Sequence, residues 1–244
     1  MSLAVMSLAA TYRLGTRLFW RDRAMLFASV VTPVALSVGM PLLMRRVRAG
    51  DAAAAAEMFT ASLAILLSVT AFMNIAVALV NRRDQLVLKR LRATALTDGQ
   101  ILAGQIASTA TQTLAVTAVC AAVARLTADV SPPAGVLVFA LVSAAGSAVM
   151  TLLGAAWTAV IPRAELAAAY AMPVFLICSV AAGAMGPIPL PGWLRPALDL
   201  LPTSVVVDAV RTGDAVRALL VLAGWAVAGL VALRLWFRWE PRRS

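Results

Sequence analysis

The chain has 244 residues, of which 62% are hydrophobic and only 13% charged, and its mean hydropathy is +0.90. Soluble domains average about 45–50% apolar and 25% charged residues, so this composition excludes an ordinary soluble domain and predicts a polytopic membrane protein. The formal charge of +10 requires no nucleic acid as a partner, because basic loops and attraction to anionic membrane lipid account for it.

The first segment, residues 8–23, is interpreted as an interfacial helix. Arg13, Arg17 and Arg21 recur at every fourth position and share one helical face, while leucines occupy the other side. Such a helix lies in the membrane interface; the alternative is a cytoplasmic extension of the first span. The first ten residues lack the basic region of a secretory signal, so we expect no cleaved leader.

Six apolar stretches have about the 20-residue length that a helix needs to cross a bilayer. They cover residues 24–44, 58–80, 101–126, 135–161, 166–185 and 215–237. We therefore expect one transmembrane domain, residues 1–244, with an all-α fold of six transmembrane helices. Six spans put both termini on one side, and that side holds 14 of the 21 basic residues. Because basic residues favour the inner side, we expect both termini in the cytoplasm.

The loop between the second and third spans reads NRRDQLVLKRLRATALT and holds five of the basic residues. Leu88 and Leu91 follow helical spacing beside Lys89, so we expect a short amphipathic coupling helix over residues 82–97. Such a helix can bind in a groove of a soluble protein; the alternative is an ordinary basic loop. The residues that we expect to contact a soluble partner are Arg82, Arg83, Asp84, Leu88, Lys89, Arg90, Leu91 and Arg92.

Uncharged polar residues enter the second and third spans. Gln105, Thr109 and Gln112 share one helical face, and an amide facing lipid would leave its hydrogen bonds unmade. The stripe should therefore face protein or a hydrated path. Hydrogen bonding between helices is the simpler explanation; the alternative is a substrate path along Asn74, Gln105, Thr109 and Gln112.

Residues 186–213 form the longest segment outside the spans and open with the proline-rich GPIPLPGW. The apolar residues that follow predict short re-entrant helices that enter the outer leaflet or cap the bundle. Trp157 and Trp236 fall near predicted inner ends and Trp193 in the outer loop, which fits an aromatic belt at the two membrane surfaces.

No residue pattern predicts catalysis. The chain has no histidine, and Cys120 and Cys178 lie inside predicted spans without a neighbouring cysteine, so we expect neither a metal site nor a disulfide. No carboxylate lies near a span centre, which argues against proton-driven transport. The single lysine, Lys89, follows no glycine-rich phosphate loop. We expect no catalytic or cofactor-binding residue, and ATP would have to be hydrolysed by another chain.

The sequence RRDQLVLKRLRATAL, followed by ILAGQI, resembles the signature of ABC-2 type permeases. The likeness is strongest to the drug-efflux branch of daunorubicin-resistance permeases, whose pattern is close to R-R-D-R-G-V-L-K-R-L-R-A-T-P-L-P. Leu86 replaces the glycine of that pattern, and Ala95 and Thr97 replace its prolines. The outer sequence PLPGWLRPALDLLPTSVVVDAVR is similar to the family's proline–tryptophan loop, so the resemblance covers nearly the whole chain.

The resemblance implies a non-enzymatic permease subunit of an exporter in the plasma (inner) membrane of a bacterium. It implies a dimer with a second copy or a paralogue, and two copies of a cytoplasmic ABC ATPase that binds ATP and Mg and contacts the coupling helix. The implied cargo is a hydrophobic drug, antibiotic or natural product, as in antibiotic resistance; lipid or glycan export is the alternative. A membrane scaffold or sensor, or a transporter driven by an ion gradient, are rivals from other classes.

Overall fold

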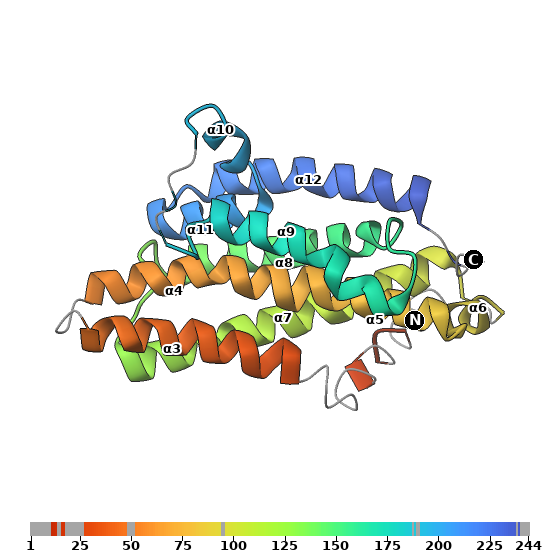
Figure 1. Ribbon diagram of the computed structural model, residues 1–244, viewed down its shortest axis with the longest axis horizontal. Helices are drawn as coiled ribbons and strands as arrows, with labels where there is room; N and C mark the ends of the chain where they lie inside the picture. The colour runs from red at the N-terminus through yellow and green to blue at the C-terminus, as the bar shows by residue number, and fades with distance from the viewer. Residues whose placement is uncertain are drawn as a thin grey trace.

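The helices of the chain run along one long axis and form an elongated bundle in the computed structural model (Figure 1). The structure describes residues 11–13, 16–17, 27–47, 52–93, 96–186, 188, 191–237 and 239. Within these ranges every regular element is helical, which confirms the predicted all-α class. The elements are η1 Phe27–Val31, α3 Thr32–Val47, α4 Ala52–Leu66, η2 Leu67–Met73, α5 Asn74–Asp84, α6 Val87–Arg92, α7 Asp98–Ala128, α8 Val136–Trp157, η3 Ala164–Leu166, α9 Ala167–Ala181, α10 Arg195–Leu198, α11 Pro202–Thr212 and α12 Ala215–Trp236.

Five helices of the described ranges are long and apolar enough to cross a membrane: Ala53–Asp84, Asp98–Ala128, Val136–Trp157, Ala164–Ala181 and Ala215–Trp236. The first expected span, 24–44, overlaps η1 and α3, but its described apolar helix, Pro33–Leu43, is shorter than the other five. A polytopic membrane protein is therefore established, while the count of six spans stays a prediction.

The second and third spans are longer than hydropathy predicts. Helical backbone runs from Ala52 to Asp84 where residues 58–80 were expected, and α7 covers 98–128 where 101–126 were expected. Residues 81–84 (NRRD) and 98–100 (DGQ) are polar ends that continue the helical backbone beyond the apolar stretch, and a run of alanines extends the second span at its start. At the start of α7 a capping box extends the helix: the Thr97 hydroxyl accepts from the Gln100 N–H at 3.3 Å, and the Gln100 amide oxygen accepts from the Thr97 N–H at 3.0 Å.

Helix α8 is the central element of the bundle and packs against α12, α7, η2 and α11. Its small residues are buried, namely Ser143, Ser147, Thr151 and Ala155, as expected for a stripe that lets helices approach closely. The closest approach is at Gly154, where an added Cβ would overlap the Phe72 carbonyl oxygen. Glycine is therefore required there by space, because the backbone of the second span lies directly against it.

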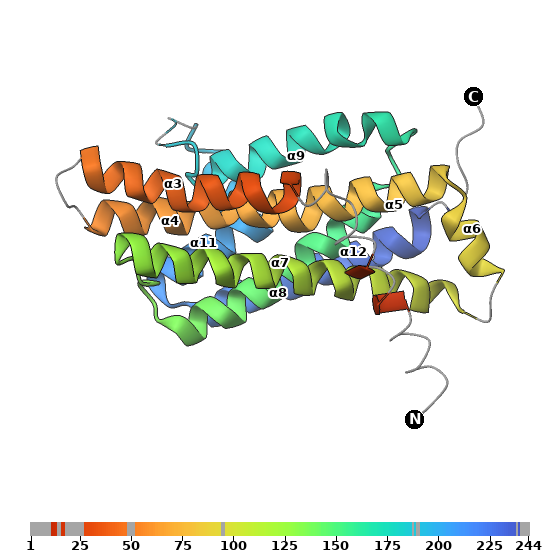
Figure 2. The same ribbon diagram turned by 90° about the horizontal axis from the view of Figure 1, so that it is seen from below.

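Helix α11 lies inside the bundle. It follows the short helix α10 within the predicted outer segment 186–213, and it packs against α4, α8 and α12. Its residues Val205, Val206, Val207 and Val210 are buried, which explains why so many apolar side chains occur in a segment too short to span a bilayer. Figure 2 shows the neighbouring pairs α3 with α4 and α7 with α8 from below.

The second span contains a π-helical segment, η2, between α4 and α5. A π-helix bonds residue i to i+5 and holds an extra residue in its turn, and such segments occur frequently at functional sites. The side chain of Phe72, near the end of η2, is buried and stacks obliquely on Trp157 with ring centroids 6.2 Å apart. The π segment thus sets the position of an aromatic side chain in the middle of the bundle.

The described residues near the two ends of the chain lie at the end of the bundle that carries α6. The Thr11 hydroxyl donates to the Gln100 carbonyl at 3.3 Å, and Leu88 of α6 is clustered with Leu233 and Phe237 at the end of α12. Residues 11–13 and 16–17 of the predicted interfacial helix 8–23 are helical, with Arg13 and Arg17 exposed; the rest of that prediction, including Arg21, lies outside the described residues.

Candidate functional site

The segment predicted as one coupling helix over 82–97 is divided in two, which corrects that prediction. Helix α5 continues to Asp84, a turn follows at 85–86, and α6 covers only Val87–Arg92. The backbone N–H of Gln85 donates to Asn81 O at 2.9 Å and that of Leu86 to Arg83 O at 3.0 Å, which ends α5. Leu86 has φ 59°, and this left-handed residue turns the chain so that α6 leaves the axis of α5 (Figure 1).

Leu86 stands where the resembling pattern has glycine. A left-handed conformation costs an ordinary residue about 1–2 kcal/mol because its Cβ approaches the following carbonyl oxygen, whereas glycine adopts it freely. The turn that a glycine would favour is therefore kept in this chain with a leucine, whose side chain is 44% exposed. The missing glycine leaves the turn in place and adds a local backbone cost.

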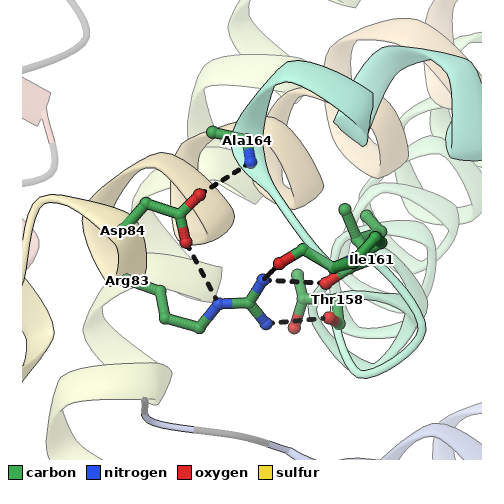
Figure 3. A network of polar contacts seen from close by, with 6 residues as sticks. Arg83, Asp84, Thr158, Ile161 and Ala164 are labelled. Carbon is green, nitrogen blue, oxygen red and sulfur yellow. Dashed lines mark hydrogen bonds and ion pairs between the residues drawn. The ribbon is translucent and has the colours of Figure 1, made fainter. Parts of the chain in front are cut away.

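Arg83 is only 2% exposed and reaches into the loop that joins α8 to α9 (Figure 3). Its Nη1 donates to the Thr158 carbonyl at 3.3 Å, and its Nη2 donates to the carbonyls of Ile161 at 2.7 Å and Pro162 at 3.3 Å. The planar fork of a guanidinium suits such multiple acceptors. Because a buried charge is costly unless it is paired and hydrogen-bonded, these carbonyls are the contacts that make its burial tolerable.

Asp84 completes a connection that we call the Arg83–Asp84 clamp. Its Oδ1 lies 3.6 Å from Arg83 Nε, within ion-pair range, and its Oδ2 accepts a hydrogen bond from the Ala164 N–H at 2.7 Å (Figure 3). Ala164 begins the short helix η3 that leads into α9. The end of α5 is therefore tied to both sides of the α8–α9 loop.

The predicted contact surface stays a prediction, and its residues differ in burial. Arg83 and Leu88 are buried within the chain, so their side chains are not available to a soluble partner in this structure: Arg83 holds the α8–α9 loop, and Leu88 packs in a cluster with Ile101 and Leu233. Leu91 is half-buried against the same cluster, while Lys89 is exposed. The side chains of Arg90 and Arg92 lie outside the described ones. Arg82 is half-buried, and its Nη1 has no hydrogen-bond partner among the described residues.

The polar stripe on α7 faces protein. Gln105, Ser108 and Thr109 are buried, and the Gln112 amide donates to the Ser108 hydroxyl at 2.9 Å, which in turn lies 3.0 Å from the Thr16 hydroxyl. Hydrogen bonds between the N-terminal segment and α7 thus satisfy one part of the stripe. Asn74 Oδ1 and Gln105 Nε2 are buried without a hydrogen-bond partner in the described part of the chain.

The structure does not gather the predicted path residues around one cavity. Gln112 lines a cavity of about 270 Å³ between α3 and α7, and Asn74, Gln105 and Thr109 do not line it. A substrate path along these four residues stays a prediction.

The described residues contain no cluster of three or more potential metal ligands. Cys120 and Cys178 are both free and buried, on α7 and α9.

An apolar cavity was missed by sequence reasoning. It has a volume of about 800 Å³ and lies between η2, α8, α9, α11 and α12. Its aromatic walls come from residues 72, 157, 225, 236 and 237, which are spread over most of the sequence. A local pattern cannot bring them together, and Trp157 and Trp236 fit an aromatic belt equally well in the sequence.

In the part of the chain that the structure describes, an all-helical bundle with five helices long enough to span a bilayer, a short amphipathic helix at one end and a clamp behind that helix defines a multi-pass membrane protein. The chain belongs to the ABC-2 type transporter family, whose model matches residues 7–214. A search of curated proteins found no match. Family membership makes the chain a membrane permease component of an ABC transporter and implies association with an ABC ATPase subunit.

Proposed function

We propose that this protein is the permease subunit of an ABC exporter that moves a hydrophobic drug, antibiotic or natural product out of the cell. The observation that carries the proposal is the Arg83–Asp84 clamp behind α6. Helix α6 presents Lys89 to solvent at one end of the bundle and buries Leu88 beneath it. The clamp joins the end of α5 to the α8–α9 loop. A subunit bound at α6 would therefore act on several spans at once.

The energy would come from a separate cytoplasmic ATPase, which binds ATP and Mg. Two ATPase copies and a second permease copy or paralogue would complete the exporter. Closure of the ATPases would push α6, and the clamp would pass this displacement to α8 and α9. In this arrangement the end that carries α6, and with it both termini, faces the cytoplasm of a bacterium.

The cargo class is supported by the resemblance of residues 82–96 to the daunorubicin-resistance branch and by the 800 Å³ cavity, whose described lining residues are all uncharged. Lipid or glycan export is the alternative within the same family. A scaffold that recruits a soluble protein would use the same exposed α6 but would move nothing.

The contact with the ATPase is tested by charge reversal at α6. Replacing Lys89, Arg90 and Arg92 with glutamate should lower the Mg-dependent ATPase activity that copurifies with the protein by about tenfold, because charged interface contacts govern such association. The matched control reverses Arg125, Arg211 and Arg217, which are exposed near the other end of the bundle and change the net charge equally. Equal activity in both preparations would contradict the docking of the ATPase at α6.

Transport is tested in inverted membrane vesicles. Accumulation of an uncharged aromatic dye that requires ATP and the ATPase supports export. Recruitment of the ATPase without flux would favour a scaffold, and flux that follows an ion gradient without the ATPase would favour a secondary transporter.

A further inference from the structure

We propose that the 800 Å³ cavity between α8, α9 and α12 is the binding site for an uncharged, aromatic small molecule and that this molecule is the cargo. The assignment of the ligand as cargo rests on the proposed export function. The site is distinct from the polar stripe on α7, because none of Asn74, Gln105, Thr109 and Gln112 lines it.

The cavity has the size and the shape of a ligand site. Small-molecule sites occupy about 300–1,000 Å³ and are lined mainly by hydrophobic and aromatic side chains. Here the floor is formed by Phe72, Met150 and Cys178, which are buried, and the rim by Leu235 and Trp236, which are 68% and 63% exposed. The cavity therefore penetrates between the helices, and its depth distinguishes it from a flat face to which another helix would pack.

The chemistry of the walls selects an apolar ligand. The Trp157 indole N–H donates to the Tyr170 carbonyl at 3.0 Å, and the Trp225 indole N–H donates to the Leu200 carbonyl at 2.7 Å. Because the single N–H of each indole already donates to a backbone carbonyl, these two side chains present only ring surface to a ligand. Among the described lining residues none is charged. A ligand with a buried charge or many hydrogen-bonding groups would lose its hydration there without replacement.

The same hydrogen bonds fix the aromatic walls in place. The bond from Trp157 joins the end of α8 to α9, and the bond from Trp225 joins α12 to the residues before α11. Phe72 is held between Gly154 of α8 and the Trp157 ring. Aromatic rings prefer tilted or offset contacts with other rings, so a rigid wall of this kind favours a planar ring compound.

The rim of the cavity lies at the end of the bundle that carries α6. Leu235 and Trp236 end α12 and follow Leu233, which packs in the cluster with Leu88 of α6. The Trp157 wall leads directly into residues 158–162, whose carbonyls hold Arg83. The cavity and the clamp therefore share the end of α8, so a displacement of α6 would change the shape of the site.

The test measures binding of N-phenyl-1-naphthylamine, an uncharged aromatic fluorophore, to the full-length protein in detergent. Ala232 lines the cavity, and Ala232→Trp would fill it. Ala223 is exposed on α12 and does not line the cavity. It precedes Ala232 by nine residues, a rotation of about 900° around the helix, and therefore lies on the opposite side of α12. Ala223→Trp is therefore a control that adds the same fluorescent side chain. We expect Ala232→Trp to weaken binding about tenfold or more, the effect of losing roughly 1.4 kcal/mol, and Ala223→Trp to leave it within about twofold. Equal affinities would overturn the site.

A second pair keeps the test decisive if Ala232→Trp does not fold. Leu235 at the exposed rim and Leu230, exposed and outside the lining, are changed to tryptophan. Only Leu235→Trp should weaken binding. Two other occupants would also overturn the assignment. Loss of a copurified phospholipid in Ala232→Trp with unchanged dye affinity would identify an acyl chain, and conversion of a dimer to a monomer with unchanged dye affinity would identify a second copy.

Measurements of ATP-dependent dye transport distinguish the proposed export function from the proposed cargo site. If wild-type vesicles transport the dye with ATP and Ala232→Trp transports it equally well, the cavity is not the cargo site while export stands. If the purified protein binds the dye in the cavity but no ATP-dependent flux occurs with the ATPase present, the export function fails while the binding site stands.

Discussion

Arginine and aspartate form ion pairs at both ends of the bundle, and the two pairs differ in burial. At the α6 end, the side chains of Arg83 and Asp84 are 2% and 28% exposed, and the Arg83 guanidinium also donates to three carbonyls. At the other end, Arg217 lies 3.2 Å from Asp208 with the two side chains 51% and 48% exposed. Exposed pairs contribute little because water screens them, whereas removing one member of a buried pair leaves groups without partners. The Arg83–Asp84 pair therefore connects α5 to the α8–α9 loop, whereas the Arg217–Asp208 pair is only a surface contact.

The largest expected effect is that of Arg83→Ala. The change removes the side-chain donor of the Thr158, Ile161 and Pro162 carbonyls, of which that of Thr158 still accepts from the Ile161 N–H. It also leaves Asp84 without its ion-pair partner, and the free energy of unfolding should fall by about 3–5 kcal/mol. Thermal unfolding of the purified protein in detergent measures the loss. Arg83→Lys keeps the positive charge but not the planar guanidinium, so its loss of unfolding free energy should be smaller than that of Arg83→Ala. A loss no larger than that of Arg217→Ala would remove the contrast between the two ends.

Substitutions at Asp84 distinguish the contribution of its negative charge from that of its hydrogen bond with Ala164. Asp84→Ala removes the acceptor of the Ala164 N–H and should cost about 1.5–3 kcal/mol, the range for hydrogen bonds to charged groups. Asp84→Asn keeps an acceptor oxygen at that position and should cost less. Both values come from the same unfolding measurement. Equal losses would indicate that the negative charge, rather than the hydrogen bond to η3, matters.

Leu86→Gly should increase stability. Relief of the left-handed leucine gains about 1–2 kcal/mol, and the greater freedom of glycine in the unfolded chain offsets about 0.5–1 kcal/mol. The two ranges together give a net gain between about 0 and 1.5 kcal/mol. Val87→Gly, one residue later and helical, is the control and should destabilise. If Leu86→Gly also destabilises, the leucine side chain contributes packing that its partial exposure does not suggest.

Arg217→Ala should have the smallest effect. The pair with Asp208 is half exposed, so its loss should change the free energy of unfolding by about 0.2–1 kcal/mol. Raising the salt concentration should reduce the difference between wild type and variant further, because salt screens exposed charges. The buried clamp should respond much less to salt, and an equal salt dependence at both ends would contradict the comparison.

Sequence patterns predicted the features that depend on residues close together in the chain. The helical spacing of Leu88 and Leu91 beside Lys89 correctly indicated a short amphipathic helix. Apolar length indicated the five helices that are long enough to span a bilayer, with ends that differ from the prediction by up to six residues. The role of Arg83 could not be predicted, because its acceptors are more than seventy positions away in the sequence. The basic sequence RRD at residues 82–84 is typical of an exposed loop, and nothing in it indicated that Arg83 would be buried. The aromatic cavity was missed for the same reason, since Phe72, Trp157 and Trp225 come together only through packing.

The π segment within the second span has a practical consequence for site-directed work. Each residue added to a turn rotates all later side chains by about 100° relative to an uninterrupted α-helix. A helical wheel drawn at constant period through residues 52–84 would therefore place Asn74, Leu79 and Arg83 on incorrect azimuths relative to Phe59. Cysteine pairs for crosslinking, or spin labels for distance measurements, need separate projections before Leu67 and after Met73.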